Sequence, residues 1–129
     1  MMRGTMAAFL LGALLAIPIA AEETMQVQLA TTIGEGPDQE VKKIHQGPWT
    51  QLTQITLRNG KPLTTHQAKE AVTIQCVSGK GTLVVDGGKR IALTPGVVVL
   101  LEPNVAHAVE SAPEVSVLVT RFPATRRGD

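Results

Sequence analysis

Short apolar segments recur along most of the chain, and residues that favour turns separate them. Beyond Trp49 these segments are rich in Val, Ile, Leu and Thr, a spacing and composition typical of β-sandwiches and barrels. No segment of this part shows the helical apolar period bounded by caps. We therefore predict an all-β domain, with strands over residues 52–57, 72–77, 82–85, 90–93, 97–101, 106–109 and 115–121.

Turn signals define how some of these strands connect. Asp86-Gly87-Gly88 closes a predicted hairpin over residues 82–93, and the glycine-rich stretch 78–81 predicts another turn. In the strand before the turn at residues 78–81, we expect Val72, Ile74 and Cys76 to face inward.

The segment 97–101 is apolar at every position. Such a run is typical of a strand that is covered on both faces. A second subunit can supply one of the two covers, so the pattern favours a homodimer.

Residues 1–21 have the layout of a secretory signal peptide. Arg3 lies near the start, an apolar run extends from Met6 to Ala16, and Pro18 and small residues follow. The run is shorter than the roughly 20 residues that span a bilayer. We expect a leader helix cleaved near Ala21, which predicts a secreted or periplasmic protein with no stable membrane span after cleavage. An uncleaved amphiphilic anchor is the alternative.

The rest of the chain divides into an arm, a barrel and a tail. Glycines and prolines interrupt residues 22–48, where we predict an N-terminal arm with edge strands at 27–29 and 41–44. The regular pattern then defines a barrel over residues 49–122. Residues 123–129 have no apolar period and are expected to form a frayed tail. Trp49 is expected to plug the core or cover an edge.

Composition and charge exclude several functions. The chain has 129 residues, enough for one domain, and 12 basic against 11 acidic residues give a net charge of +1. This near-neutral balance gives no excess of basic residues of the kind that binds nucleic acid. Aromatic residues are only 2%, too few to stack on bases or sugars. Cys76 is the only cysteine, so an internal disulfide is impossible, and we expect it to be a core residue.

Candidate chemistry rests on histidines. The chain has no HExxH sequence, no phosphate-binding glycine loop and no GxSxG elbow. His66 lies just before the predicted strand that starts at residue 72, and His107 lies just after the Pro103-Asn104 turn, at the mouths of strands from which two imidazoles can converge on a barrel cavity. There they can hold a metal, hydrogen-bond a ligand or transfer a proton. His45 reads as an exposed loop residue.

Two segments resemble the motifs of the cupins. Residues 60–79, GKPLTTHQAKEAVTIQCVSG, are similar to the first motif, in which Gly, His, His, Glu and Gly follow in order. Residues 95–107, PGVVVLLEPNVAH, are similar to the second motif, in which a proline-containing turn leads to a histidine. The resemblance implies a single jelly-roll barrel of the cupin type, with His66 and His107 at metal-ligand positions.

The departures from the motif weaken the metal site. The second histidine of the first motif falls on Ala68 and its glutamate on Val72. Two imidazoles alone would hold Fe, Mn, Ni, Cu or Zn weakly, because a transition ion takes three or four protein donors. Replacement donors near in sequence are His45, Gln67, Glu70, Gln75 and Cys76. Thr64, Thr65 and Glu102 are candidates for orienting the rings.

Three functions remain open at this point. The first is an exported module that binds a small molecule in a mostly apolar cavity, with His66 and His107 as its polar site. The second is a metal-dependent enzyme, an oxygenase or isomerase as the resemblance implies, with a non-standard third ligand. The third is a structural subunit whose function is its dimer surface, for which a charge at Val99 is the test. Whether a reaction is catalysed, and on which substrate, the sequence leaves open.

Overall fold

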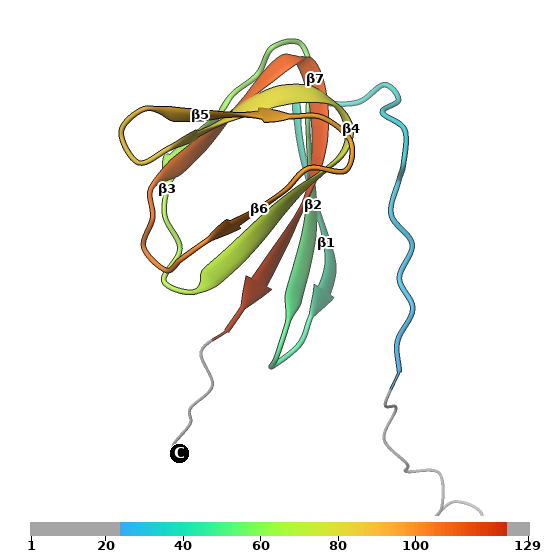
Figure 1. Ribbon diagram of the computed structural model, residues 1–129. Helices are drawn as coiled ribbons and strands as arrows, with labels where there is room; N and C mark the ends of the chain where they lie inside the picture. Colours follow the sequence, from blue (N-terminus) through green and yellow to red (C-terminus); the bar gives the residue numbers. More distant parts are fainter. Residues whose placement is uncertain (1–23, 124–129) are drawn as a thin grey trace, which may run out of the picture.

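The computed structural model describes residues 24–123, and in this range the regular structure consists of seven β-strands with antiparallel pairing (Figure 1). The all-β prediction is confirmed. The leader and most of the predicted tail lie outside the described residues. Within them, no helix meets the length and apolarity needed to cross a membrane. The strands are β1 (Gln39–Gln46), β2 (Gln51–Leu57), β3 (Leu63–His66), β4 (Ala71–Val85), β5 (Lys89–Leu93), β6 (Val98–Leu101) and β7 (His107–Phe122).

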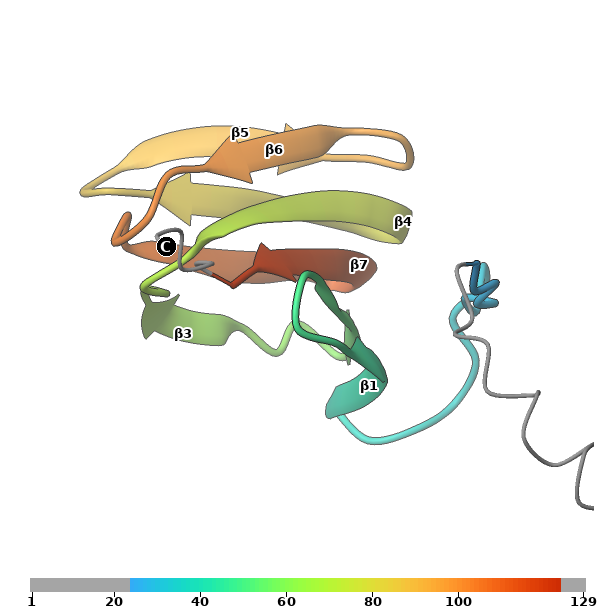
Figure 2. The same ribbon diagram turned by 90° about the horizontal axis from the view of Figure 1, so that it is seen from below.

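Two long strands, β4 and β7, pair along nearly their whole length and organise the barrel (Figures 1 and 2). The first half of β4 also pairs with β6, and its second half pairs with β5. The first half of β7 pairs with β3, and its second half pairs with β2, which in turn pairs with β1. Each long strand therefore belongs to both layers of a jelly roll, and the sheet folds over on itself.

The predicted turn at residues 78–81 is wrong, because β4 continues through it. The register against β7 shifts between Cys76 and Ser78 and again between Gly79 and Gly81. Gly79 has a φ of 80°, and a Cβ there would collide with the backbone carbonyl of Glu114. The glycines thus allow β4 to bend closely against β7 between the layers, where the sequence pattern predicted a reversal.

Other predictions were correct in part. The hairpin between β4 and β5 is confirmed, with Val85 paired to Lys89. The segments 106–109 and 115–121 belong to one strand, β7, and the short strand β3 was not predicted. Of the two predicted edge strands, the one at 41–44 is β1, whereas residues 27–29 form no strand. Since β1 extends the barrel sheet, the sheet begins before Trp49.

The core lies between the two layers. Val72, Ile74 and Cys76 are buried, which confirms the predicted phase of this segment. Trp49 is 69% exposed at the turn between β1 and β2, so it does not plug the core. The buried apolar residues are Leu57, Ala68, Val72, Ile74, Cys76, Leu83, Val85, Leu93, Leu101, Val109, Val115 and Val117.

Strand β6 is covered on one face only. Leu101 is buried, but Val98 is 46% and Leu100 is 75% exposed. The expectation that both faces of 97–101 are covered is therefore not met within the single chain.

The N-terminal arm is held against the barrel by buried polar side chains. The side-chain amide of Gln54 accepts a hydrogen bond from the backbone N–H of Ala30. It donates hydrogen bonds to the Ala30 carbonyl and to the Ser116 hydroxyl. The Arg58 guanidinium donates to the carbonyls of Gly34 and Pro37, both at 2.7 Å. These contacts secure the arm at two points.

Candidate functional site

His66 and His107 come together at one end of the barrel. They are Cα partners in the pairing of β3, which ends at His66, with β7, which begins at His107. Their ring centroids are 4.3 Å apart, with the planes inclined by 60°. The sequence prediction that the two imidazoles converge thus agrees with the structure, although the strand that carries His66 was not predicted.

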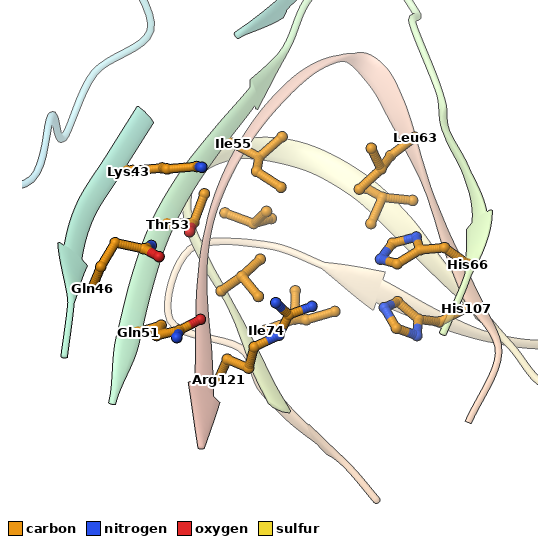
Figure 3. A pocket seen from close by; sticks show the side chains of 13 residues that line it. Lys43, Gln46, Gln51, Thr53, Ile55, Leu63, His66, Ile74, His107 and Arg121 are labelled. Atoms are coloured by element: carbon orange, nitrogen blue, oxygen red, sulfur yellow. The ribbon is translucent and has the colours of Figure 1, made fainter. Parts of the chain in front are cut away.

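Backbone carbonyls fix the orientation of both rings. Nδ1 of His107 lies 2.8 Å from the carbonyl of Val105, and Nδ1 of His66 lies 3.1 Å from that of Thr64. Because a carbonyl only accepts, each Nδ1 carries the hydrogen, and in the neutral ring Nε2 keeps a lone pair. Figure 3 shows both rings turned so that one nitrogen of each faces the cavity. The orienting groups are backbone carbonyls, not the side chains of Thr64, Thr65 or Glu102.

The two histidines differ in environment. His107 is 4% exposed, whereas His66 is exposed at the mouth of the cavity. Burial lowers the pKa of His107; the hydrogen bond to Val105 opposes this shift, and the neighbouring His66 adds to it. At neutral pH His107 is therefore a neutral acceptor toward the cavity.

The imidazoles form one wall of a cavity of about 240 Å³. Six of its thirteen lining residues are apolar, and five polar lining residues besides the two histidines were not predicted. Figure 3 shows Lys43, Gln46, Gln51 and Thr53 on β1 and β2, across the cavity from the histidines. The full lining consists of Lys43, Gln46, Gln51, Thr53, Ile55, Leu63, His66, Ile74, His107, Val109, Val117, Val119 and Arg121.

Strand alternation explains how these polar residues reach the cavity. Gln51, Thr53 and Ile55 alternate along β2, so their side chains share one face, and Lys43 is the register partner of Thr53 on β1. The alternation is visible in the sequence. Which face points inward depends on the pairing of β2 with β7, which the sequence does not reveal.

A transition metal fits this donor set poorly. Ala68 and Val72, at the positions where cupins carry ligands, are buried in the core, and His45, Gln67, Gln75 and Cys76 do not line the cavity. Glu70 pairs with Arg121 at 3.3 Å. Within residues 24–123 no group of three or more His, Cys, Asp or Glu side chains is placed to hold a metal ion. Two imidazoles fall short of the three or four donors that such an ion takes.

The sequence matches the family model of the AraC-like ligand-binding domain over residues 37–128. This match covers more than half of the chain. The chain belongs to the AraC-like ligand-binding domain family. Comparison with curated proteins gives no match. The family match includes both histidines and every residue that lines the cavity.

Solved structures show that this AraC-like domain has the cupin fold. An RmlC-like cupin from Desulfovibrio desulfuricans superposes with a TM-score of 0.70 at 22% identity, over 78% of this chain and 98% of that one. A cupin with a double-stranded β-helix fold from Methanocaldococcus jannaschii has a TM-score of 0.64 at 18% identity, over 80% of this chain and 94% of that one. At these identities the similarity shows the fold, so the predicted cupin jelly roll is confirmed.

An enzyme is also among the similar structures. A variant of salicylate 1,2-dioxygenase from Pseudoaminobacter salicylatoxidans, in complex with gentisate, has a TM-score of 0.62 at 16% identity. The match covers 67% of this chain but only 26% of the dioxygenase. The AraC-like domain shares its fold with part of that enzyme.

Proposed function

We propose that this AraC-like domain binds a small molecule in the cavity between the histidine pair and the polar side chains of β1 and β2. The observation that carries the proposal is the orientation of His66 and His107. Both rings are oriented by backbone carbonyls, and both turn a nitrogen toward the cavity (Figure 3). A concave site with an apolar lining and a few convergent polar groups is the usual form of a ligand pocket.

Replacing both histidines with alanine tests this function. The His66→Ala, His107→Ala variant is expected to lose the ligand-induced increase in melting temperature that the unaltered protein gives with members of a metabolite panel. His45→Ala is the matched control, because His45 does not line the cavity. Ligand-induced shifts that survive in the double variant would exclude the histidine pair as part of the binding site.

A metal-dependent oxygenase or isomerase is the second candidate. The paired imidazoles, each with Nδ1 bonded to a carbonyl, are the observation that favours it. A tight site would also need a third donor from outside the described residues or from the ligand. Elemental analysis of untagged protein purified without chelator tests this candidate. Stoichiometric Fe, Mn, Ni, Cu or Zn that is lost in the double histidine variant would support it, and its absence at neutral pH would count against it.

We further propose that the protein is exported and that two copies associate. The leader pattern supports export, and sequencing of the mature N-terminus from a secreted or periplasmic fraction tests it, with a start close after Ala21 expected. An intact N-terminus in the membrane fraction would support the anchor instead.

The exposed Val98 and Leu100 on β6, a strand at the end of its layer, support the association of two copies.

A further inference from the structure

The cavity has an excess of positive charge. Lys43 and Arg121 are among its lining residues, and no Asp or Glu belongs to the lining within the described chain. No carboxylate of the described residues lies within ion-pair distance of Lys43, whose ammonium group points toward the cavity in Figure 3. A ligand that enters the cavity therefore meets a cation.

Arg121 is only partly neutralised. Its Nε lies 3.3 Å from Oε1 of Glu70, which is not a lining residue. Together Lys43, Arg121 and Glu70 leave one net positive charge at the cavity. Such a site favours a monoanion, and the guanidinium of Arg121, which is the register partner of Gln51, offers the planar donors that suit a carboxylate.

The wall formed by His66 and His107 presents hydrogen-bond acceptors, so it requires a donor from the ligand. Because each Nδ1 of His66 and His107 is engaged by a carbonyl, each ring in its neutral form presents Nε2 as an acceptor. An anion placed against these lone pairs would be repelled, whereas a hydroxyl group can donate to them. Ile55, Ile74 and Val119 also line the cavity and suit an apolar body.

We propose that the ligand is a small hydroxy-carboxylic acid, with its carboxylate at Arg121 and Lys43, an apolar body, and a hydroxyl that donates to the histidine pair. This inference rests on the proposed function and defines the ligand class for the same cavity. A volume of about 240 Å³ restricts the apolar body to one ring or a short chain.

A set of four probes separates the two polar ends. The probes are 4-hydroxybenzoate, benzoate, 4-hydroxybenzamide and benzamide, and the corresponding set built on hexanoate covers a linear body. Calorimetric titration of the full-length protein at neutral pH is expected to give the tightest binding with the hydroxy acid of at least one set. Loss of the negative charge should weaken binding about tenfold or more, and loss of the hydroxyl should weaken it several-fold.

Charge variants assign the carboxylate to its side of the cavity. Arg121→Met and Lys43→Met should each weaken binding of the hydroxy acid about tenfold and that of its amide much less. Lys42→Met is the matched control, because Lys42 is adjacent in sequence but outside the cavity lining. Glu70→Gln should tighten binding of the acid, since it removes the carboxylate that competes for Arg121.

The outcomes distinguish this inference from the proposed function. If amides bind as tightly as acids, or if Arg121→Met and Lys43→Met weaken both classes equally, the hydroxy-acid assignment is overturned while binding in the cavity stands. If no probe of either set binds, the hydroxy-acid assignment is overturned and the proposed function is decided by the metabolite panel. If binding of a probe persists in the double histidine variant, the proposed site is contradicted as well. An acid preference that disappears in both charge variants confirms the assignment.

Discussion

His107 is buried beneath His66, and the two residues are register partners across β3 and β7 with ring centroids 4.3 Å apart. The pair therefore has an inner ring and an outer ring at the same end of the cavity. The inner ring is desolvated, and its environment keeps it neutral. The outer ring is exposed, so solvent and any entering ligand reach it first.

The burial of His107 makes stability depend on pH. Burial lowers its pKa below the ordinary value of 6.5, so near and below that value the folded state binds fewer protons than the unfolded state. The stability contributed by the neutral ring is fully present above pH 6.5 and is lost as the pH falls toward the lower folded pKa. We expect the urea midpoint to decrease on acidification through this window.

The variant His107→Gln isolates this contribution. It removes the titrating group but keeps an amide donor in reach of the Val105 carbonyl. The decrease of the urea midpoint below pH 6.5 should become shallower than in the unaltered protein. A decrease of the same steepness in both proteins would show that other groups determine the acid sensitivity.

Gly79→Ala tests the bend between the layers. The residue has a φ of 80°, and an added Cβ would collide with the backbone at Glu114 and Val115. We expect a loss of about 2 kcal/mol or more in the free energy of unfolding, measured by chemical denaturation. Gly34→Ala, where a Cβ meets nothing within 4 Å, should change it by less than about 0.5 kcal/mol. Equal effects at the two positions would contradict the close approach of β4 and β7.

Arg58 tests the attachment of the N-terminal arm. The side chain is buried, donates to the carbonyls of Gly34 and Pro37, and pairs with Glu40 at 2.9 Å. Arg58→Met should cost about 3 kcal/mol, because it removes two hydrogen bonds that a buried guanidinium donates to the arm, and should expose the arm to limited proteolysis. Arg90→Met, which removes an exposed ion pair with Glu110, should leave the free energy of unfolding and the protease resistance of the arm unchanged. An arm that stays protected in Arg58→Met would show that Gln54 is sufficient to hold it.

Leu100→Asp tests the proposed association. Leu100 is 75% exposed on β6, and a charge there should convert a dimer into a monomer in analytical ultracentrifugation without changing the fold. Val99, the position indicated by sequence, packs against the core and would confound the test by unfolding the protein. Val41→Asp, on the exposed part of β1, is the matched control. A monomeric unaltered protein, or a dimer that survives Leu100→Asp, would refute this interface.

The sequence predicted the parts of the fold that depend on local pattern. Turn chemistry identified the hairpin at Asp86-Gly87-Gly88, and alternation placed Val72, Ile74 and Cys76 inside. It failed at Gly79, because the same residue type permits a reversal or a bend, and the partner strand decides between them.

The site was predicted in the same uneven way. The motif resemblance located His66 and His107, whose pairing the structure confirms. It missed Lys43 and Arg121, because their convergence depends on long-range pairing of β1, β2, β7 and β4. Glu70, a candidate replacement donor in the sequence, instead pairs with Arg121.

The most direct test of the account is the protonation pattern of the two rings. In protein labelled with ¹⁵N-histidine, long-range proton–nitrogen correlation spectra at neutral pH should show His66 and His107 largely with hydrogen on Nδ1, with a cross-relaxation contact between the rings. Addition of 4-hydroxybenzoate should shift both Nε2 resonances together. Hydrogen on Nε2 of the neutral form of either ring, or the absence of contact between the rings, would contradict the claim that both rings present an Nε2 acceptor to the same cavity.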